Sequence, residues 1–170
     1  MYTIPNLKMH EIELLNDEQL NYINEHFKYM KFSDGRISNP GAVKVCETVF
    51  DGPGNIHMNE YCRSIIEEAS FPIKPFLISQ IYFVKYAVGG QYQNHYDADI
   101  CGGVRSDYSM TCFLSDDYEG GELIITANDG KETEVKLSKG KAILYQGDLL
   151  HRVNTVTSGR RDVFVCWIEV

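Results

Sequence analysis

Several features that mark particular protein classes are missing from this 170-residue chain. It has no low-complexity tract, no internal repeat, no apolar run of membrane-spanning length and no Cys-x-x-Cys pair. Residues 1–8 lack the charged-then-apolar pattern of a secretory signal. Basic charge is also scarce, because 16 Lys and Arg face 24 Asp and Glu and leave a net charge of −8. These absences argue against a repeat protein, a membrane protein or a general nucleic-acid binder.

The five cysteines are odd in number, and Cys112 and Cys166 lie within apolar, strand-like runs. A free cysteine in such a run usually acts as a small core hydrophobe. Because disulfides are rare in reducing compartments, this usage predicts a reduced, cytoplasmic protein. The length suits one domain spanning residues 1–170 with a core of its own.

Two helices are predicted before residue 75. Asn16 can cap a first helix that begins at Asp17, with Gln19 at the capping-box position, and a second helix is expected over 59–69. The intervening stretch 33–54 is rich in Gly, Pro, Asp and Ser, and it contains a candidate strand at 42–50. We expect this loop-rich segment, from Phe32 onward, to face the substrate.

After Pro75 the pattern changes to short β segments separated by glycine-rich turns. Eight strands are predicted, at residues 78–88, 91–96, 107–114, 122–127, 132–137, 141–145, 149–154 and 162–168. This arrangement predicts a mainly β protein with amino-terminal helices (α+β), built on a double-stranded β-helix, the jelly roll of cupins. Residues 1–75 would form a helical buttress with loops against one sheet, and residues 76–170 the jelly-roll core.

Three residues have the chemistry of a metal site. Since residues i and i+2 of a strand point to the same face, His95 and Asp97 can reach one metal ion. His151, from a late strand, would complete the set. Two imidazoles and a carboxylate can hold one face of an octahedral iron(II) ion, although the same set also suits zinc. By itself a His-x-Asp pair is weak evidence, and a single histidine is more often a hydrogen-bonded structural residue.

Arg161 begins an apolar run and shares its inward face with Trp167 and the valines between them. A charged residue on such a face is costly unless it is paired. Its partner would be a ligand carboxylate or an internal acidic residue at the barrel rim. Arg160 projects to the opposite face, and it is a rival candidate together with Lys85 and Arg152.

Several further motifs stand in register along the chain. They include Arg-Ser-Asp-Tyr-Ser-Met-Thr-Cys-Phe-Leu-Ser-Asp from Arg105, Tyr-Glu-Gly-Gly-Glu-Leu-Ile-Ile from Tyr118, and Leu-His-Arg-Val-Asn-Thr-Val-Thr-Ser-Gly-Arg-Arg around His151. In these motifs the chain resembles the PKHD-type hydroxylases, within the prolyl 4-hydroxylase-type branch of the iron- and 2-oxoglutarate-dependent dioxygenases. The likeness is densest from Arg105 to Trp167.

The resemblance implies that His95, Asp97 and His151 are the iron ligands, with no catalytic residue beyond them. It also implies that Arg161 binds the C5 carboxylate of 2-oxoglutarate. The expected walls of the co-substrate pocket are Tyr86, Thr111, Phe113, Leu123, Val153, Val163 and Trp167. Related enzymes often carry a tyrosine at the position of Phe113. PKHD-type enzymes commonly continue with a helical segment after the position of Trp167, which we expect to be absent here.

The resemblance further implies iron(II), 2-oxoglutarate and dioxygen as cofactor and co-substrates, with ascorbate as a candidate reductant. The implied reaction is hydroxylation of a prolyl residue in a peptide or protein, with decarboxylation of 2-oxoglutarate to succinate. The main alternative is a non-catalytic jelly-roll module that binds a metal or a small acid. A zinc hydrolase and a nucleic-acid demethylase are further alternatives. The sequence indicates no membrane partner, disfavours nucleic acid and leaves the oligomeric state open.

Overall fold

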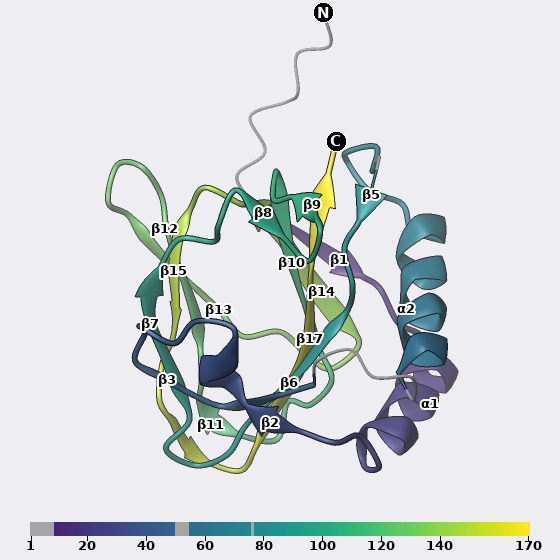
Figure 1. Cartoon of the computed structure of the whole chain (residues 1–170), viewed down its shortest axis with the longest axis horizontal. Helices are drawn as coiled ribbons and strands as arrows, with labels where there is room; N and C mark the ends of the chain where they lie inside the picture. Colours follow the sequence, from purple (N-terminus) through teal and green to yellow (C-terminus); the bar gives the residue numbers. More distant parts are fainter. Residues whose placement is uncertain (1–8, 50–54, 76) are drawn as a thin grey trace, which may run out of the picture.

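Two antiparallel β-sheets form the frame of the computed structural model, which describes residues 9–49, 55–75 and 77–170 (Figure 1). The large sheet has the order β1-β14-β10-β17-β6-β4-β2, and β5 pairs with β17. Its strands are β1 (Met9–Glu13), β2 (Ser33–Asp34), β4 (Glu47–Thr48), β5 (Leu77–Ile78), β6 (Tyr82–Tyr86), β10 (Tyr108–Phe113), β14 (Lys141–Gln146) and β17 (Arg161–Glu169).

The small sheet has the order β13-β12-β15-β7-β3. Its strands are β3 (Lys44–Val45), β7 (Gln91–His95), β12 (Leu123–Thr126), β13 (Glu132–Val135) and β15 (Leu150–Val153). Two short strand pairs complete the β structure, β8 (Ile100–Cys101) with β9 (Val104–Arg105) and β11 (Glu119–Gly120) with β16 (Val156–Ser158). This is the predicted double-stranded β-helix.

Two helices, α1 (Asp17–Phe27) and α2 (Ile56–Glu68), pack against the outer face of the large sheet (Figure 1). The capping box predicted for α1 is present, since Asn16 Oδ1 accepts from the Gln19 backbone N–H at 2.8 Å and Gln19 Oε1 accepts from the Asn16 N–H at 2.9 Å. The apolar face of α1, including Leu20 and Ile23, is buried. The helices therefore buttress one sheet, as expected. No helix in the described ranges is both long and apolar enough to cross a membrane.

Strand alternation divides the buried side chains of the large sheet between two cores. Met110 and Cys112 of β10 point toward the helices, whereas Phe113 belongs to the core between the sheets. The same alternation in β17 places Phe164 on the helix side and Val163 between the sheets. The inward face predicted for β17 is therefore confirmed, and it leads directly to the functional site.

Some element boundaries differ from the predictions. The candidate strand at 42–50 is two strands, because β3 pairs with β7 of the small sheet whereas β4 pairs with β6 of the large sheet. The chain thus crosses between the sheets at Cys46, whose carbonyl accepts from the Gly35 N–H at 2.9 Å. Phe50, the last residue of that prediction, lies outside the described residues.

Other differences concern the edges of the fold. The prediction that helices come first was wrong for the described residues, since β1 precedes α1 and pairs with β14. The strand predicted at 78–88 is interrupted between β5 and β6, where the buried Asn59 side chain accepts from the Ile81 backbone N–H at 2.7 Å. Helix α2 begins at Ile56, three residues before the predicted start, and Asn55 caps it without a side-chain hydrogen bond.

Candidate metal and co-substrate site

A cavity of about 390 Å³ opens between the two sheets, within the usual size range of small-molecule sites. Nine of the eleven residues proposed from the sequence line it, namely Tyr86, His95, Asp97, Thr111, Leu123, His151, Val153, Arg161 and Trp167. Phe113 is fully buried beneath the cavity and is not among the lining residues. Val163 is likewise buried in the core between the sheets.

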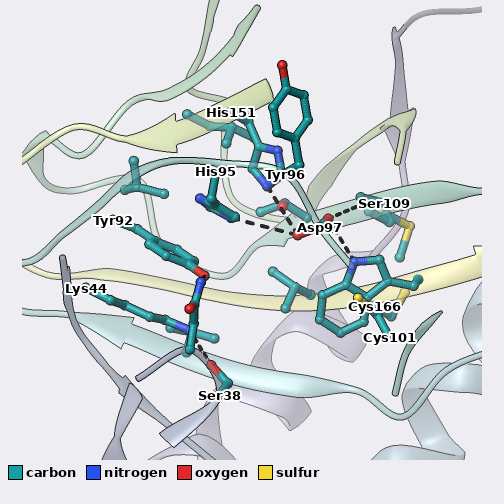
Figure 2. A pocket seen from close by; sticks show the side chains of 18 of the residues that line it. Ser38, Lys44, Tyr92, His95, Tyr96, Asp97, Cys101, Ser109, His151 and Cys166 are labelled. Atoms are coloured by element: carbon teal, nitrogen blue, oxygen red, sulfur yellow. Dashed lines mark hydrogen bonds and ion pairs between the residues drawn. The ribbon is translucent and has the colours of Figure 1, made fainter. Parts of the chain in front are cut away.

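The three candidate ligands meet at one wall of this cavity. His95 ends β7 and lies directly opposite His151 of β15 in the antiparallel register, and Asp97 follows two residues after His95. Asp97 Oδ1 lies 3.8 Å from His95 Nε2 and 3.6 Å from His151 Nε2 (Figure 2). One donor atom from each residue falls within 4.8 Å of the other two. The folded chain therefore brings the three donor atoms together.

Backbone carbonyls orient both imidazoles. His95 Nδ1 lies 2.8 Å from the Gln93 carbonyl oxygen, and His151 Nδ1 lies 2.9 Å from that of Leu149. Because a carbonyl oxygen can only accept, Nδ1 carries the hydrogen and Nε2 keeps its lone pair for a metal. Burial, together with the neighbouring His151, lowers the pKa of His95 to about 4, which favours the neutral ring that a metal requires.

The two oxygens of Asp97 have different surroundings. Oδ2 accepts from Ser109 Oγ at 2.7 Å and from Trp167 Nε1 at 2.9 Å, whereas Oδ1 faces the histidines. A carboxylate held in this way offers one oxygen to a metal, and such supporting hydrogen bonds fix the orientation of a ligand. Trp167 thus contacts Asp97 in addition to lining the cavity. Ser109 was missed, although it lies two residues before Thr111 on the same face of a predicted strand.

Arg161 lies at another wall and is only 1% exposed. Its guanidinium carbon is 5.0 Å from the centre of the Tyr86 ring and 5.5 Å from that of Phe113. No carboxylate in the described part of the chain forms an ion pair with Arg161, and its buried Nε has no hydrogen-bond partner there. A buried donor without a partner is costly, so the side chain fits an anionic ligand such as a carboxylate.

The rival cations have acidic partners of their own. The ion pairs are Arg160–Asp162 at 2.8 Å, Lys85–Glu47 at 3.4 Å and Arg152–Glu132 at 2.5 Å. Arg160 also lies over the ring of Phe27 from α1, which confirms that it projects to the helix side of the sheet. None of the three rivals lines the cavity.

Sequence reasoning also missed an aromatic and polar part of the cavity. Tyr92 stacks on His95 with ring centres 3.7 Å apart, and its hydroxyl accepts from Asn39 Nδ2 at 3.0 Å. Tyr145 is buried with its ring edge-on to His151, and burial raises its pKa well above the usual value. Lys44 and Asn39 come from the loop-rich segment expected to face the substrate, and both line the cavity.

Two histidines and one aspartate at a cavity inside a jelly roll are the arrangement of a non-heme iron oxygenase. The family model of the 2OG-Fe(II) oxygenase superfamily matches residues 81–169, so the chain belongs to this superfamily. It is an oxygenase whose cofactor and co-substrate are iron(II) and 2-oxoglutarate.

Individual relatives agree with this assignment. A PKHD-type hydroxylase of Acaryochloris marina is 46% identical over 92% of this chain and 75% of its own length. A prolyl-4-hydroxylase of Pseudomonas putida superposes with a TM-score of 0.71 at 16% identity, covering 98% of this chain and 94% of its own. A prolyl hydroxylase from Trichoplax adhaerens, in complex with a peptide fragment of the hypoxia inducible factor, gives 0.70 at 15% identity, with 97% and 84% covered. At these low identities, the two solved structures support the fold of this chain alone.

Proposed function

We propose that this oxygenase hydroxylates a prolyl residue in a peptide or protein while 2-oxoglutarate is decarboxylated to succinate. The observation that carries the proposal is the meeting of the His95, Asp97 and His151 donor atoms within 4.8 Å in the cavity that Arg161 also lines. When bound, iron(II) and 2-oxoglutarate supply the power to oxidise an unactivated C–H bond with dioxygen.

In this proposal the chain positions its cofactor and co-substrate. The Nε2 atoms of His95 and His151 and the Oδ1 atom of Asp97 hold iron(II). Arg161 receives the C5 carboxylate, because a guanidinium offers paired donors to a carboxylate and this one has a free, buried Nε. Leu123 and Val153 give the same cavity apolar walls, which help to exclude water from the reacting atoms.

The prolyl peptide substrate is supported by the names of the relatives and by the cavity's surroundings. PKHD-type and prolyl hydroxylases recur among the similar proteins, and one was solved with a peptide bound. Tyr96, which lines the cavity, is 65% exposed, and Ile100, the chain neighbour of the cavity-lining Cys101, is 62% exposed. Exposed apolar side chains beside a site commonly contact a partner. A zinc hydrolase is less well supported, since Asp97 is the sole carboxylate among the described residues that line the cavity.

The test is anaerobic reconstitution with iron(II) and 2-oxoglutarate, followed by exposure to oxygen with prolyl peptides present. Succinate is followed by NMR and hydroxyproline by mass spectrometry. We expect both products from the native protein and neither from Asp97→Ala, because the variant lacks the charged ligand. Full succinate production by Asp97→Ala would refute the metal assignment. Succinate without hydroxyproline would retain the oxygenase and reject the prolyl substrate.

A further inference from the structure

Lys44 is the second cation among the described residues that line the cavity, and neither the iron ligands nor Arg161 account for it. Its ammonium group donates to Ser38 Oγ at 2.6 Å and lies 4.5 Å from the centre of the Tyr92 ring. Among the described residues, no carboxylate forms an ion pair with it. An ammonium group has three N–H donors, and the single hydrogen bond to Ser38 leaves donors for a ligand.

The position of Lys44 differs from that of Arg161. Figure 2 shows Tyr92 between Lys44 and His95, so the ammonium group stands beside the metal wall of the cavity. Arg161 instead lies against Tyr86 and Phe113 and is almost completely buried. If Arg161 binds the C5 carboxylate of 2-oxoglutarate, Lys44 remains available to contact a different molecule.

The electrostatics of Lys44 favour an anionic neighbour. Burial lowers the pKa of Lys44, whereas Cys46 and, to a smaller extent, the negative charge of Asp97 oppose that shift. An iron(II) ion bound to Asp97 would neutralise the charge of this carboxylate. The ammonium group of Lys44 would then lose the attraction of Asp97. A half-buried cation in this situation is stabilised by a charge-assisted hydrogen bond to an anion.

We propose that Lys44 is an anion subsite for a carboxylate of the substrate close to the residue that is hydroxylated. This inference rests on the proposed function and narrows it to acidic substrates. The carboxylate can come from an acidic side chain beside the target proline or from the carboxyl terminus of a peptide ending in proline. Both sources present the same group to Lys44, and they are distinguished by experiment.

The experiment compares matched prolyl peptides in which the neighbouring residue is Glu, Gln or Lys, with both termini blocked. A second pair ends in proline as the free acid or as the amide. Binding to the anaerobic protein loaded with iron(II) and 2-oxoglutarate is measured by calorimetry, and hydroxyproline is then measured after oxygen is admitted. We expect either the Glu peptide or the free-acid peptide to bind about tenfold more tightly than its amide counterpart. A difference of this size corresponds to one charge-assisted hydrogen bond.

Variants assign this preference to Lys44. Lys44→Met keeps the aliphatic stem on Tyr92 and should reduce the preference for the carboxylate to near unity. Lys44→Glu should reverse it, so that the Lys peptide binds best. Lys85→Met is the matched control, since Lys85 also lies over an aromatic ring, Phe32, but outside the cavity, and the preference should survive there.

Each result has a clear meaning. Equal binding and hydroxylation of the acid and amide peptides would overturn the subsite and leave the prolyl hydroxylase proposal intact. A Lys44-dependent acid preference without hydroxyproline would retain the subsite and reject prolyl hydroxylation. Failure of every peptide to bind would overturn both. A raised KM for 2-oxoglutarate in Lys44→Met, with peptide selectivity unchanged, would assign Lys44 to the co-substrate and overturn the subsite.

Discussion

Asp97 illustrates how neighbouring side chains assign different tasks to two chemically equal oxygens. Ser109 and Trp167 both donate to Oδ2, and Oδ1 is left facing His95 and His151. Both donors come from the large sheet, whereas the histidines belong to the small sheet. The orientation of one carboxylate therefore depends on residues far away in the sequence.

We predict that Trp167→Phe weakens iron(II) binding about tenfold, the lower end of the effect seen when a supporting hydrogen bond to a metal ligand is lost. The phenyl ring fills most of the space but cannot donate to Asp97. The measurement is an anaerobic iron(II) titration by calorimetry. Ser109→Ala should give a loss of similar size.

Ser79→Ala is the matched control for this prediction. Ser79 Oγ accepts from the backbone N–H of Trp167 at 2.9 Å and donates to the Gln80 carbonyl oxygen at 2.7 Å, but it forms no hydrogen bond with Asp97, so iron affinity should be retained. If Trp167→Phe bound iron as tightly as the native protein, the indole would not be needed to orient Asp97.

A second prediction concerns Arg161. Arg161→Lys keeps the charge but loses the planar fork of donors, and we expect the KM for 2-oxoglutarate to rise about tenfold or more. Iron affinity should stay close to native. Arg160→Lys is the control, because Arg160 is paired with Asp162 on the helix side. An equal rise in KM for both variants would show that general destabilisation, not carboxylate binding, is responsible.

Single site residues could be predicted from the sequence when their chemistry is unusual for their position in the chain. His95 and Arg161 stand out because metal-binding and charged groups rarely occupy an inward strand face, and Asp97 stands out because it follows His95 by two residues. Ser109 and Lys44 do not stand out, since a serine on a strand and a lysine in a short strand of a loop-rich segment are ordinary. Their neighbours in space come from other strands, and only the folded register shows what they contact.

Among the elements, the turn between β11 and β12 controls the space around Arg161. Gly121 has a φ of +65°, and a Cβ atom there would lie 2.9 Å from Val156 Cγ2 and 3.2 Å from Arg161 Cδ. A side chain at Gly121 therefore meets both backbone strain and a crowded neighbour. A larger residue at this turn would therefore displace the Arg161 side chain.

We predict that Gly121→Ala lowers the free energy of unfolding by about 1–3 kcal/mol and raises the KM for 2-oxoglutarate. Urea denaturation and steady-state kinetics measure the two effects. Gly130→Ala is the matched control, because its φ of +83° gives the same strain while a Cβ atom there has nothing within 4 Å. A KM change of equal size in both variants would contradict the steric role of Gly121.

Elements with a clear sequence pattern were predictable, and those defined by distant partners were not. Strands β10 and β17 are long runs that are buried at nearly every position, and α1 has a capping box and an apolar face. In contrast, β3 and β4 have two residues each and exist because different sheets pair with them. No local pattern in a two-residue strand can indicate which sheet it joins.

On the scale of the whole molecule, the candidate metal site connects the two sheets. His95 and His151 belong to the small sheet, and Asp97 is bonded to Ser109 and Trp167 of the large sheet. A bound ion would therefore add a link across the interior of the jelly roll.

We predict that saturating iron(II) and 2-oxoglutarate stabilise the fold, by about 2.7 kcal/mol when a ligand is present at a hundred times its dissociation constant. Thermal unfolding under anaerobic conditions measures the effect as a rise in Tm, and a chelator should reverse it. Asp97→Ala should show no metal-dependent rise. A metal-induced rise of the same size in that variant would place the bound ion elsewhere.

The bond between Trp167 and Asp97 also gives the protein an optical signal of its own. Trp167 is the single tryptophan of the chain, and its indole nitrogen lies 2.9 Å from Asp97 Oδ2. Indole emission responds to the charge and the quenchers beside the ring, and all tryptophan fluorescence arises from an indole bonded to the proposed metal ligand Asp97. Loading of the site should be visible as a change in emission intensity in the unlabelled protein, in real time and without any substrate.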